Sequence, residues 1–317
     1  LWKKTHYKKF EEFDGVKTAH IINKLKKHTV PTKAVEYSIP EWLAETLEKE
    51  LGPSWEKEMM ALNEQAPTIL RVNTLKTTAK ELISDLKVEG VDSFQIKNYP
   101  DAVQLDVKKN VFLTSAFKDG LFEVQDASSQ KIGQLLDVQE GMRVVDVCAG
   151  AGGKTLHLAA LMKNKGQIIA LDIYEWKLAE LKRRAKRAGA HNIETRVIED
   201  NKVIKRLHEK ADRLLIDSPC SGLGVLKRNP DSKWKIDQEF IDRIKKEQEK
   251  ILQDYAKILK KGGKMIYATC SILPSENNEQ VEIFLKNNEG YSLIKEEKVM
   301  PSEGFDGFYM ALIERKA

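Results

Sequence analysis

The feature that most constrains this chain is a regular alternation of short apolar segments with amphipathic helical segments after residue 121. The apolar segments are RVVDVC, GQIIALD, IETRVIED, ADRLLID and GKMIYAT. Helical patterns occupy residues 176–189 and 237–263 between them. Such an alternation predicts a mostly parallel, doubly wound sheet with helices on both faces. We therefore expect an α/β, Rossmann-like domain over residues 121–317.

Two smaller units are expected ahead of this domain. Residues 1–65 have helical patterns at residues 15–27 and 38–52, and the second of these stops at a glycine. From residue 66 to 120 the pattern changes to strand, helix and strand, in the segments TILRVNTLK, TAKELISDLKVEG and FQIKNYPDAVQLD. We expect a helical segment followed by a small α+β domain. A helix after FEVQ is expected to be capped by Asp126.

The apolar residues argue against a membrane-spanning segment, and the spacing of the cysteines argues against a metal site. No apolar run approaches the roughly 20 residues that a membrane span requires, and no signal peptide opens the chain. We therefore expect a cytoplasmic protein. The three cysteines lie too far apart for a C-x-x-C pair, and their odd number argues against a disulfide framework. Free thiols and no metal are the expectation.

Acids or thiols stand at or just beyond the end of each predicted strand of the large domain. In such sheets the ligand lies beyond the carboxyl ends of the strands, so these side chains are expected to share one site. In chain order the strand-end residues are Asp146 and Cys148, then Asp172, Asp200, Asp217 with Cys220, and Thr269 with Cys270. Packing alone does not require this pattern.

The glycine-rich turn DVCAGAGGKT, residues 146–155, permits close approach of a ligand to backbone amides at a helix N-terminus. A dinucleotide fingerprint would need a third glycine where Thr155 stands. A phosphate loop with magnesium on the DSP acid would match the G-K-T end, but its first glycine is replaced by Cys148. The hydride-transfer and NTPase interpretations are therefore weaker, and the NTPase is kept as an alternative.

S-adenosylmethionine is the third possible ligand of this turn, since it needs a bare backbone for its methionine part and a carboxylate for its ribose. Asp172 fits the ribose role, and Asp200 could lie near the adenine, although either acid could instead cap a helix. The expected cofactor-binding set is Cys148, Ala149, Gly150, Ala151, Gly152, Gly153, Lys154, Asp172, Asp200 and Asp217.

Two thiols in one site suit the methylation of a pyrimidine. Carbon 5 of the ring is a poor nucleophile, but addition of a thiolate at carbon 6 turns the ring into an enamine that can attack an activated methyl group. A carboxyl group near nitrogen 3 would assist this addition. Afterwards the carbon 5 proton must leave and the first thiol must be expelled, and a second thiol could assist there.

The segments DSPCSG (217–222) and ATCS (268–271) resemble the two signature motifs of the Sun/Fmu family of RNA cytosine-C5 methyltransferases. The resemblance implies a class I methyltransferase domain that uses S-adenosylmethionine. It also implies Cys270 as the nucleophile, Asp217 as the group bound to the base, and Cys220 as the thiol needed for product release. DNA cytosine enzymes take their nucleophile from the P-C motif, so a chain with both cysteines is more similar to the RNA enzymes.

The resemblance extends through most of the chain. The segments LRVNTLK, YPDAVQLD, FEVQDASSQ, KRNPDSKW and GFDGFYMALI are similar to parts of the bacterial small-subunit ribosomal RNA enzyme of this family. This implies 16S ribosomal RNA as the first candidate substrate, with transfer RNA as the alternative. The family commonly has C-A-A-P-G-G-K-T where this chain has C-A-G-A-G-G-K-T. The resemblance implies a full helical RNA-binding domain ahead of the family's small domain, and from this sequence we expect a short basic helical segment in that place.

Basic residues suggest how RNA could be held. Residues 1–33 contain nine lysines and three acids, and residues 181–192 contain five basic residues and no acid. Lys154 is a further catalytic candidate, since a cation near a thiol favours the thiolate. We expect a monomer whose small domain binds RNA. A non-catalytic RNA-binding assembly factor is an alternative, although the two retained thiols argue against it. Candidate RNA contacts elsewhere are Lys227, Arg228, Lys233, Trp234, Arg71 and Asn73.

Overall fold

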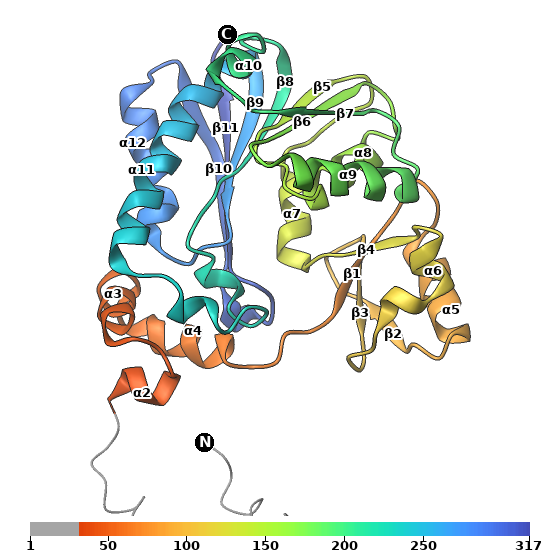
Figure 1. Ribbon diagram of the computed structural model, residues 1–317, viewed down its shortest axis with the longest axis horizontal. Helices are drawn as coiled ribbons and strands as arrows, with labels where there is room; N and C mark the ends of the chain where they lie inside the picture. Colours follow the sequence, from red (N-terminus) through yellow and green to blue (C-terminus); the bar gives the residue numbers. More distant parts are fainter. Residues whose placement is uncertain (1–31) are drawn as a thin grey trace, which may run out of the picture.

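The computed structural model describes residues 32–317, which form two β-sheets with their helices (Figure 1). The helix expected at residues 15–27 and all but one of the N-terminal lysines lie outside the described residues. No helix within residues 32–317 combines the length and the apolar character needed to cross a membrane. In the same residues, no group of three or more His, Cys, Asp or Glu side chains is arranged to hold a metal ion.

The large sheet has seven strands in the order β10-β11-β9-β8-β5-β6-β7. Strands β5 to β9 pair in parallel, whereas β11 pairs antiparallel with both β9 and β10. The α/β fold with a mostly parallel sheet is therefore confirmed, although the two C-terminal strands were not predicted. The strands are β5 (Arg143–Asp146), β6 (Gln167–Asp172), β7 (Ile193–Val197), β8 (Ala211–Asp217), β9 (Leu259–Thr269), β10 (Tyr291–Val299) and β11 (Phe308–Arg315).

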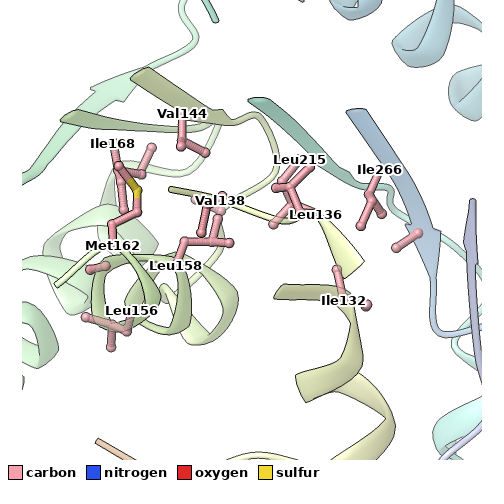
Figure 2. Packing of buried hydrophobic residues seen from close by; sticks show 14 of the residues in the cluster. Ile132, Leu136, Val138, Val144, Leu156, Leu158, Met162, Ile168, Leu215 and Ile266 are labelled. Carbon is pink, nitrogen blue, oxygen red and sulfur yellow. The ribbon is translucent and has the colours of Figure 1, made fainter. Parts of the chain in front are cut away.

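Helices cover both faces of this sheet. One face packs against α7 (Ala127–Leu135), α8 (Gly153–Leu161) and α9 (Glu175–Ala188), and Figure 2 shows part of the buried cluster between them. In that cluster Met162 lies beside Ile168 of β6, and Leu158 lies beside Val138. The other face packs against α10 (Asn201–Lys205), α11 (Gln238–Tyr255) and α12 (Asn278–Asn287). Two apolar faces explain why the strands have almost continuous apolar sequences.

The predicted long helix at residues 237–263 is too long at its C-terminal end. Helix α11 begins after Asp237, which caps it through the Phe240 amide at 2.7 Å, and ends at Tyr255. Strand β9 begins four residues later, at Leu259. The lysines and glycines of the segment KKGG fit a helix end and a strand start equally well, so hydrophobic periodicity could not place this boundary.

The small sheet has the order β2-β3-β1-β4 and is antiparallel throughout. Residues 94–106, expected as one strand, form β2 and β3 with a turn between them, and the segment before Asp126 forms β4. Asp126 caps α7 through the Ser128 amide at 2.9 Å, as predicted. The elements are β1 (Ile69–Val72), α5 (Ala79–Val88), β2 (Ser93–Gln95), β3 (Ala102–Leu105), α6 (Ser115–Lys118) and β4 (Phe122–Val124).

The N-terminal helices pack on the large domain and not on the small domain that follows them in the sequence. They are α2 (Lys33–Tyr37), α3 (Glu41–Leu51), which confirms the expected second helix, and α4 (Trp55–Leu62). Leu43 and Leu47 of α3 share a buried cluster with Leu223, Ile272 and Leu273. The domain boundaries at residues 65 and 120 stay predictions.

This contact yields a stability prediction. Replacing Leu47, which is fully buried, with alanine is expected to lower the free energy of unfolding by about 2–5 kcal/mol, because the cavity in the cluster is only partly refilled. Urea denaturation followed by circular dichroism measures the change. The matched control is Glu45→Ala on the exposed side of the same helix, which is expected to change stability by less than about 0.5 kcal/mol. Equal effects of the two substitutions would contradict the packing described here.

Candidate active site

Five of the eight predicted strand-end residues line one cavity of about 610 Å³, and Asp146, Asp200 and Thr269 do not. The cavity lies at the carboxyl ends of β5, β6, β8 and β9, where parallel sheets bind their ligands. Among the predicted site residues, those that line the cavity are Cys148, Gly150, Lys154, Asp172, Asp217, Cys220 and Cys270. The structure therefore brings the glycine-rich turn and both motif cysteines together.

The glycine-rich turn connects β5 to α8. Gly150 and Gly152 have φ angles of 55° and 86°, in the left-handed region that favours glycine. At Gly152 a Cβ atom would also lie 2.5 Å from the Leu181 side chain, so a larger residue does not fit. Ala149, Ala151, Gly152 and Gly153 belong to the turn but are absent from the cavity lining.

Asp172 is buried beside this turn at the end of β6. Its carboxylate accepts hydrogen bonds from the Gly150 amide at 2.8 Å and from the Tyr174 amide at 2.9 Å. These bonds link the turn to the start of α9. The carboxylate is therefore fixed at the cavity wall, where its predicted contact with a ribose stays a prediction.

Asp200 is placed differently from the other predicted cofactor residues. It is the N-cap of α10, where its carboxylate accepts a hydrogen bond from the Lys202 amide at 2.7 Å, and its neighbour Asn201 lines the cavity in its place. The helix cap, which was the alternative reading of this acid, is therefore what the structure shows. A contact of Asp200 with adenine stays a prediction.

Lys154 and Asp217 form an ion pair inside the cavity, with 2.6 Å between the Nζ and Oδ2 atoms. Burial alone would lower the pKa of Lys154, but the Asp217 carboxylate more than compensates and the net pKa is raised. The ammonium group also lies 5.2 Å from the centre of the Phe308 ring. Lys154 is therefore a fixed cation, and the carboxylate that the NTPase interpretation assigns to magnesium is paired with it.

The two motif cysteines are in direct contact. Their Sγ atoms lie 3.3 Å apart, although the residues are separated by 50 positions in the sequence. The hydrogen bond with Cys270, together with burial, raises the pKa of the Cys220 thiol well above its usual value. The third cysteine, Cys148, lines the same cavity, and burial raises the pKa of its thiol as well.

Glu276 holds the two cysteine-bearing segments together, and it was not among the predicted site residues. It is fully buried and accepts hydrogen bonds from the Ser221 amide at 2.7 Å and the Ser221 hydroxyl at 2.5 Å. It also accepts from the Ser271 hydroxyl and, at 3.1 Å, from the Gln248 amide nitrogen. Each serine directly follows a motif cysteine, so this carboxylate fixes both thiols relative to each other.

Further lining residues come from α9 and α11 and were also missed. Lys177 lies over the ring of Tyr174, 4.5 Å from its centre, at one side of the cavity. Glu247 and Tyr255 of α11 line another side, and burial raises the pKa of Tyr255 to about 12. These residues lie on helical faces whose sequence pattern has no motif, so no local signal identified them.

Three of the proposed RNA contacts, Arg71, Asn73 and Lys233, are wrong because the side chains are buried, whereas Arg228 is partly exposed and ion-paired. Arg71 and Asn73 are buried and donate hydrogen bonds to backbone carbonyl groups. Lys233 is buried, and Arg228 is paired with Asp126 at 2.8 Å and with Asp306 at 2.5 Å. A basic residue in a loop can equally form hydrogen bonds or ion pairs inside the protein, and composition does not distinguish this role from RNA binding. Among the remaining candidates, Lys227 donates to the Pro301 carbonyl oxygen at 3.0 Å, and Trp234 is 59% exposed.

Known proteins are similar to this chain in both sequence and fold. The family model described as 16S rRNA methyltransferase RsmB/F matches residues 133–313, and the ferredoxin-like domain of RsmF/B-like methyltransferases matches residues 39–112. Ribosomal RNA small subunit methyltransferase B of Proteus mirabilis is 34% identical over 88% of this chain and 66% of the relative. The probable counterpart from Synechocystis is 36% identical over 81% of this chain and 58% of its own length.

The chain thus spans about two thirds or less of the length of these two curated relatives. A solved structure of a methyltransferase homolog protein from Pyrococcus horikoshii is also similar. It has a TM-score of 0.79 and 26% identity, and the match covers 91% of this chain and all of that one. The family model and the fold both favour a methyltransferase over the NTPase.

Proposed function

Since the chain belongs to the RsmB/F family of 16S rRNA methyltransferases, we propose that it methylates carbon 5 of a cytosine in RNA with S-adenosylmethionine as the methyl donor. The observation that carries this proposal is the contact between Cys220 and Cys270 beside the Lys154–Asp217 ion pair. A pyrimidine C5 transfer needs a nucleophilic thiol, a second proton-transfer group and a group for the ring nitrogen. The cavity offers all three.

The cavity also fits the methyl donor. Its volume of about 610 Å³ lies in the range of small-molecule sites, and one wall is a glycine turn at a helix N-terminus. Gly150 and Lys154 would face the methionine part, and Asp172 would accept the ribose hydroxyl groups. When bound, S-adenosylmethionine supplies an electrophilic methyl group. The remaining chemistry is assigned to side chains of this protein.

Cys270 is proposed to form a bond from its sulfur to carbon 6 of the cytosine, which makes carbon 5 nucleophilic. Asp217 accepts a hydrogen bond from the amine on carbon 4 and passes to nitrogen 3 the proton that the Cys270 thiol gives up, and Lys154 holds Asp217 in place. After methyl transfer, the carbon 5 proton leaves and the sulfur–carbon 6 bond breaks. The cytosine ring regains its double bond and Cys270 leaves as a thiolate.

Cys220 is proposed to accept the carbon 5 proton. Its raised pKa arises first from the hydrogen bond with Cys270, so the thiol is protonated before the reaction. Once the Cys270 sulfur is bonded to carbon 6, it is a thioether and its hydrogen bond with the Cys220 thiol is weakened. The main reason for the raised pKa is then removed, so Cys220 releases its own proton to water and, as a thiolate, takes the proton from carbon 5. This order links proton removal to completion of the adduct.

The proposed substrate is 16S ribosomal RNA, and the family and the curated relatives support it over transfer RNA. A cytoplasmic location and a monomeric state also stay predictions. The test uses the purified full chain, a tritium-labelled methyl donor, and RNA from a strain in which the gene is deleted. We expect label on 16S RNA, and bisulfite sequencing should find one cytosine that is protected only when the gene is present.

RNA from the parent strain is the control, because its target cytosine is already methylated and should take up little label. Label on transfer RNA would replace the ribosomal substrate with the alternative. Absence of label from both RNAs, with a folded protein, would contradict the proposed function.

A further inference from the structure

The small domain presents one face of its sheet to the large domain. Leu70 and Val72 of β1 point to the core that the sheet shares with α5. Because successive side chains in a strand alternate between faces, Ile69 and Arg71 lie on the opposite face. Ile69 packs there against Ala127 of α7. This face is therefore covered by the large domain and is not free to bind RNA.

Arg71 reaches from this covered face to the glycine-rich turn. Its Nη1 atom donates to the Gly153 carbonyl oxygen and, at 2.5 Å, to the Gln125 side-chain oxygen. Burial lowers the pKa of Arg71 to about 10, so the guanidinium group is still charged at neutral pH. A buried cation thus holds one carbonyl group of the turn.

Arg184 holds a second carbonyl group of the same turn from α9. Its Nη1 atom donates to the Ala151 carbonyl oxygen at 2.8 Å, and its Nη2 atom donates to Glu123 of β4 at 2.9 Å. Glu123 is buried and stands directly opposite Arg71 in the sheet. Arg187 donates to the other Glu123 oxygen at 2.5 Å. The small domain therefore orients the arginine that binds the turn.

These bonds matter because the turn has few side chains of its own to fix it. Gly150 and Gly152 adopt left-handed conformations, and glycine loses much conformational freedom when it is ordered. The donor is expected to meet one side of this turn, whereas Ala151 and Gly153 do not line the cavity. Arg71 and Arg184 bind the turn through the carbonyl groups of these two residues.

We propose that the small domain is part of the methyl-donor site, and that Arg71, Arg184 and Glu123 are positioning residues that hold the glycine-rich turn in its binding conformation. The identity of the donor rests on the proposed function. The affinity for the donor then depends on residues that do not touch it. This role differs from the RNA binding expected of a small α+β domain, and it explains why the sheet face is buried.

The test measures binding of S-adenosylhomocysteine to the full chain by calorimetry, without RNA. Arg184→Lys is expected to weaken binding by roughly 10-fold, because lysine cannot bind Ala151 and Glu123 in the same forked geometry. Glu123→Gln is a second variant, which keeps the shape but removes the charge that orients Arg184. Arg183→Lys is the control, since its side chain is 80% exposed and pairs only with Glu180 among the described residues.

Kinetics separate positioning from a general loss of structure. For Arg184→Lys we expect a higher KM for the donor, with the KM for RNA and the kcat at saturating donor close to those of the parent protein. Unchanged donor affinity in both variants would overturn the inference, and so would a raised KM for RNA alone. If the parent protein itself does not bind S-adenosylhomocysteine, the proposed function fails. If the parent protein binds it and both variants bind it equally well, only the inference about the small domain fails.

Discussion

Replacement of Cys270 with serine is expected to abolish methyl transfer, with a loss of more than about 10³-fold, because a neutral hydroxyl group is a far weaker nucleophile toward carbon 6 than a thiolate. Cys270 lines the cavity and contacts Cys220, so the change removes the proposed bond-forming atom with little change in volume. Methyl transfer to RNA measures the activity. Thermal unfolding should be nearly unchanged.

Cys220→Ala is expected to have a different effect from Cys270→Ser. Carbon 6 can still be attacked, but no thiol is present to take the carbon 5 proton, so a covalent protein–RNA complex should accumulate and survive a denaturing gel. The double variant Cys220→Ala/Cys270→Ser should form no such complex, which identifies the attacking sulfur. If Cys270→Ser accumulated the complex and Cys220→Ala did not, the roles of the two thiols would be reversed.

Asp217→Asn is expected to reduce kcat by about 10²–10⁴-fold, the range typical of a group that assists proton transfer in the transition state. The amide keeps the size of the side chain but cannot hold a proton for nitrogen 3. It also leaves the partly buried ammonium group of Lys154 without its carboxylate, 2.6 Å away in the parent protein. Single-turnover kinetics with saturating donor measure the effect on the chemical step.

Asp212→Asn is the matched control for this prediction. Asp212 lies on the same strand, β8, and pairs with Lys260 at 2.6 Å, but neither residue lines the cavity. This variant is expected to keep its activity within about twofold, since a partly exposed ion pair contributes little. Equal loss in the two variants would show that Asp217 matters for the strand and not for the reaction.

The part of the fold that could be predicted from the sequence is the part with a strong local pattern. The strands that end at Asp172, Asp217 and Thr269 are short apolar segments between helices, and the rule for parallel sheets then places their ends together. Both cysteines follow such strands, so their meeting in one cavity was predictable. Their separation of 3.3 Å was not, since it depends on loop conformations.

Other features depend on contacts between distant segments, which local patterns do not show. Strand β10 has mixed polar and apolar residues because it lies at the sheet edge, so it has no clear strand pattern. Glu276 resembles an ordinary surface acid in the sequence, yet it is fully buried between two loops. Arg71 is a residue type typical of RNA contacts, but its side chain binds the backbone of the glycine-rich turn.

The packing of α3 on the large domain has a consequence for synthesis of the chain. Glu50 of this helix accepts hydrogen bonds from Ser275, which lies 225 residues further along the chain. At typical translation rates, roughly ten seconds to under a minute pass before that partner has been made. During this interval Leu43 and Leu47 lack Ile272 and Leu273, the neighbours that the large domain supplies to their cluster. The apolar face of this helix is therefore incompletely covered until the last third of the chain has been made.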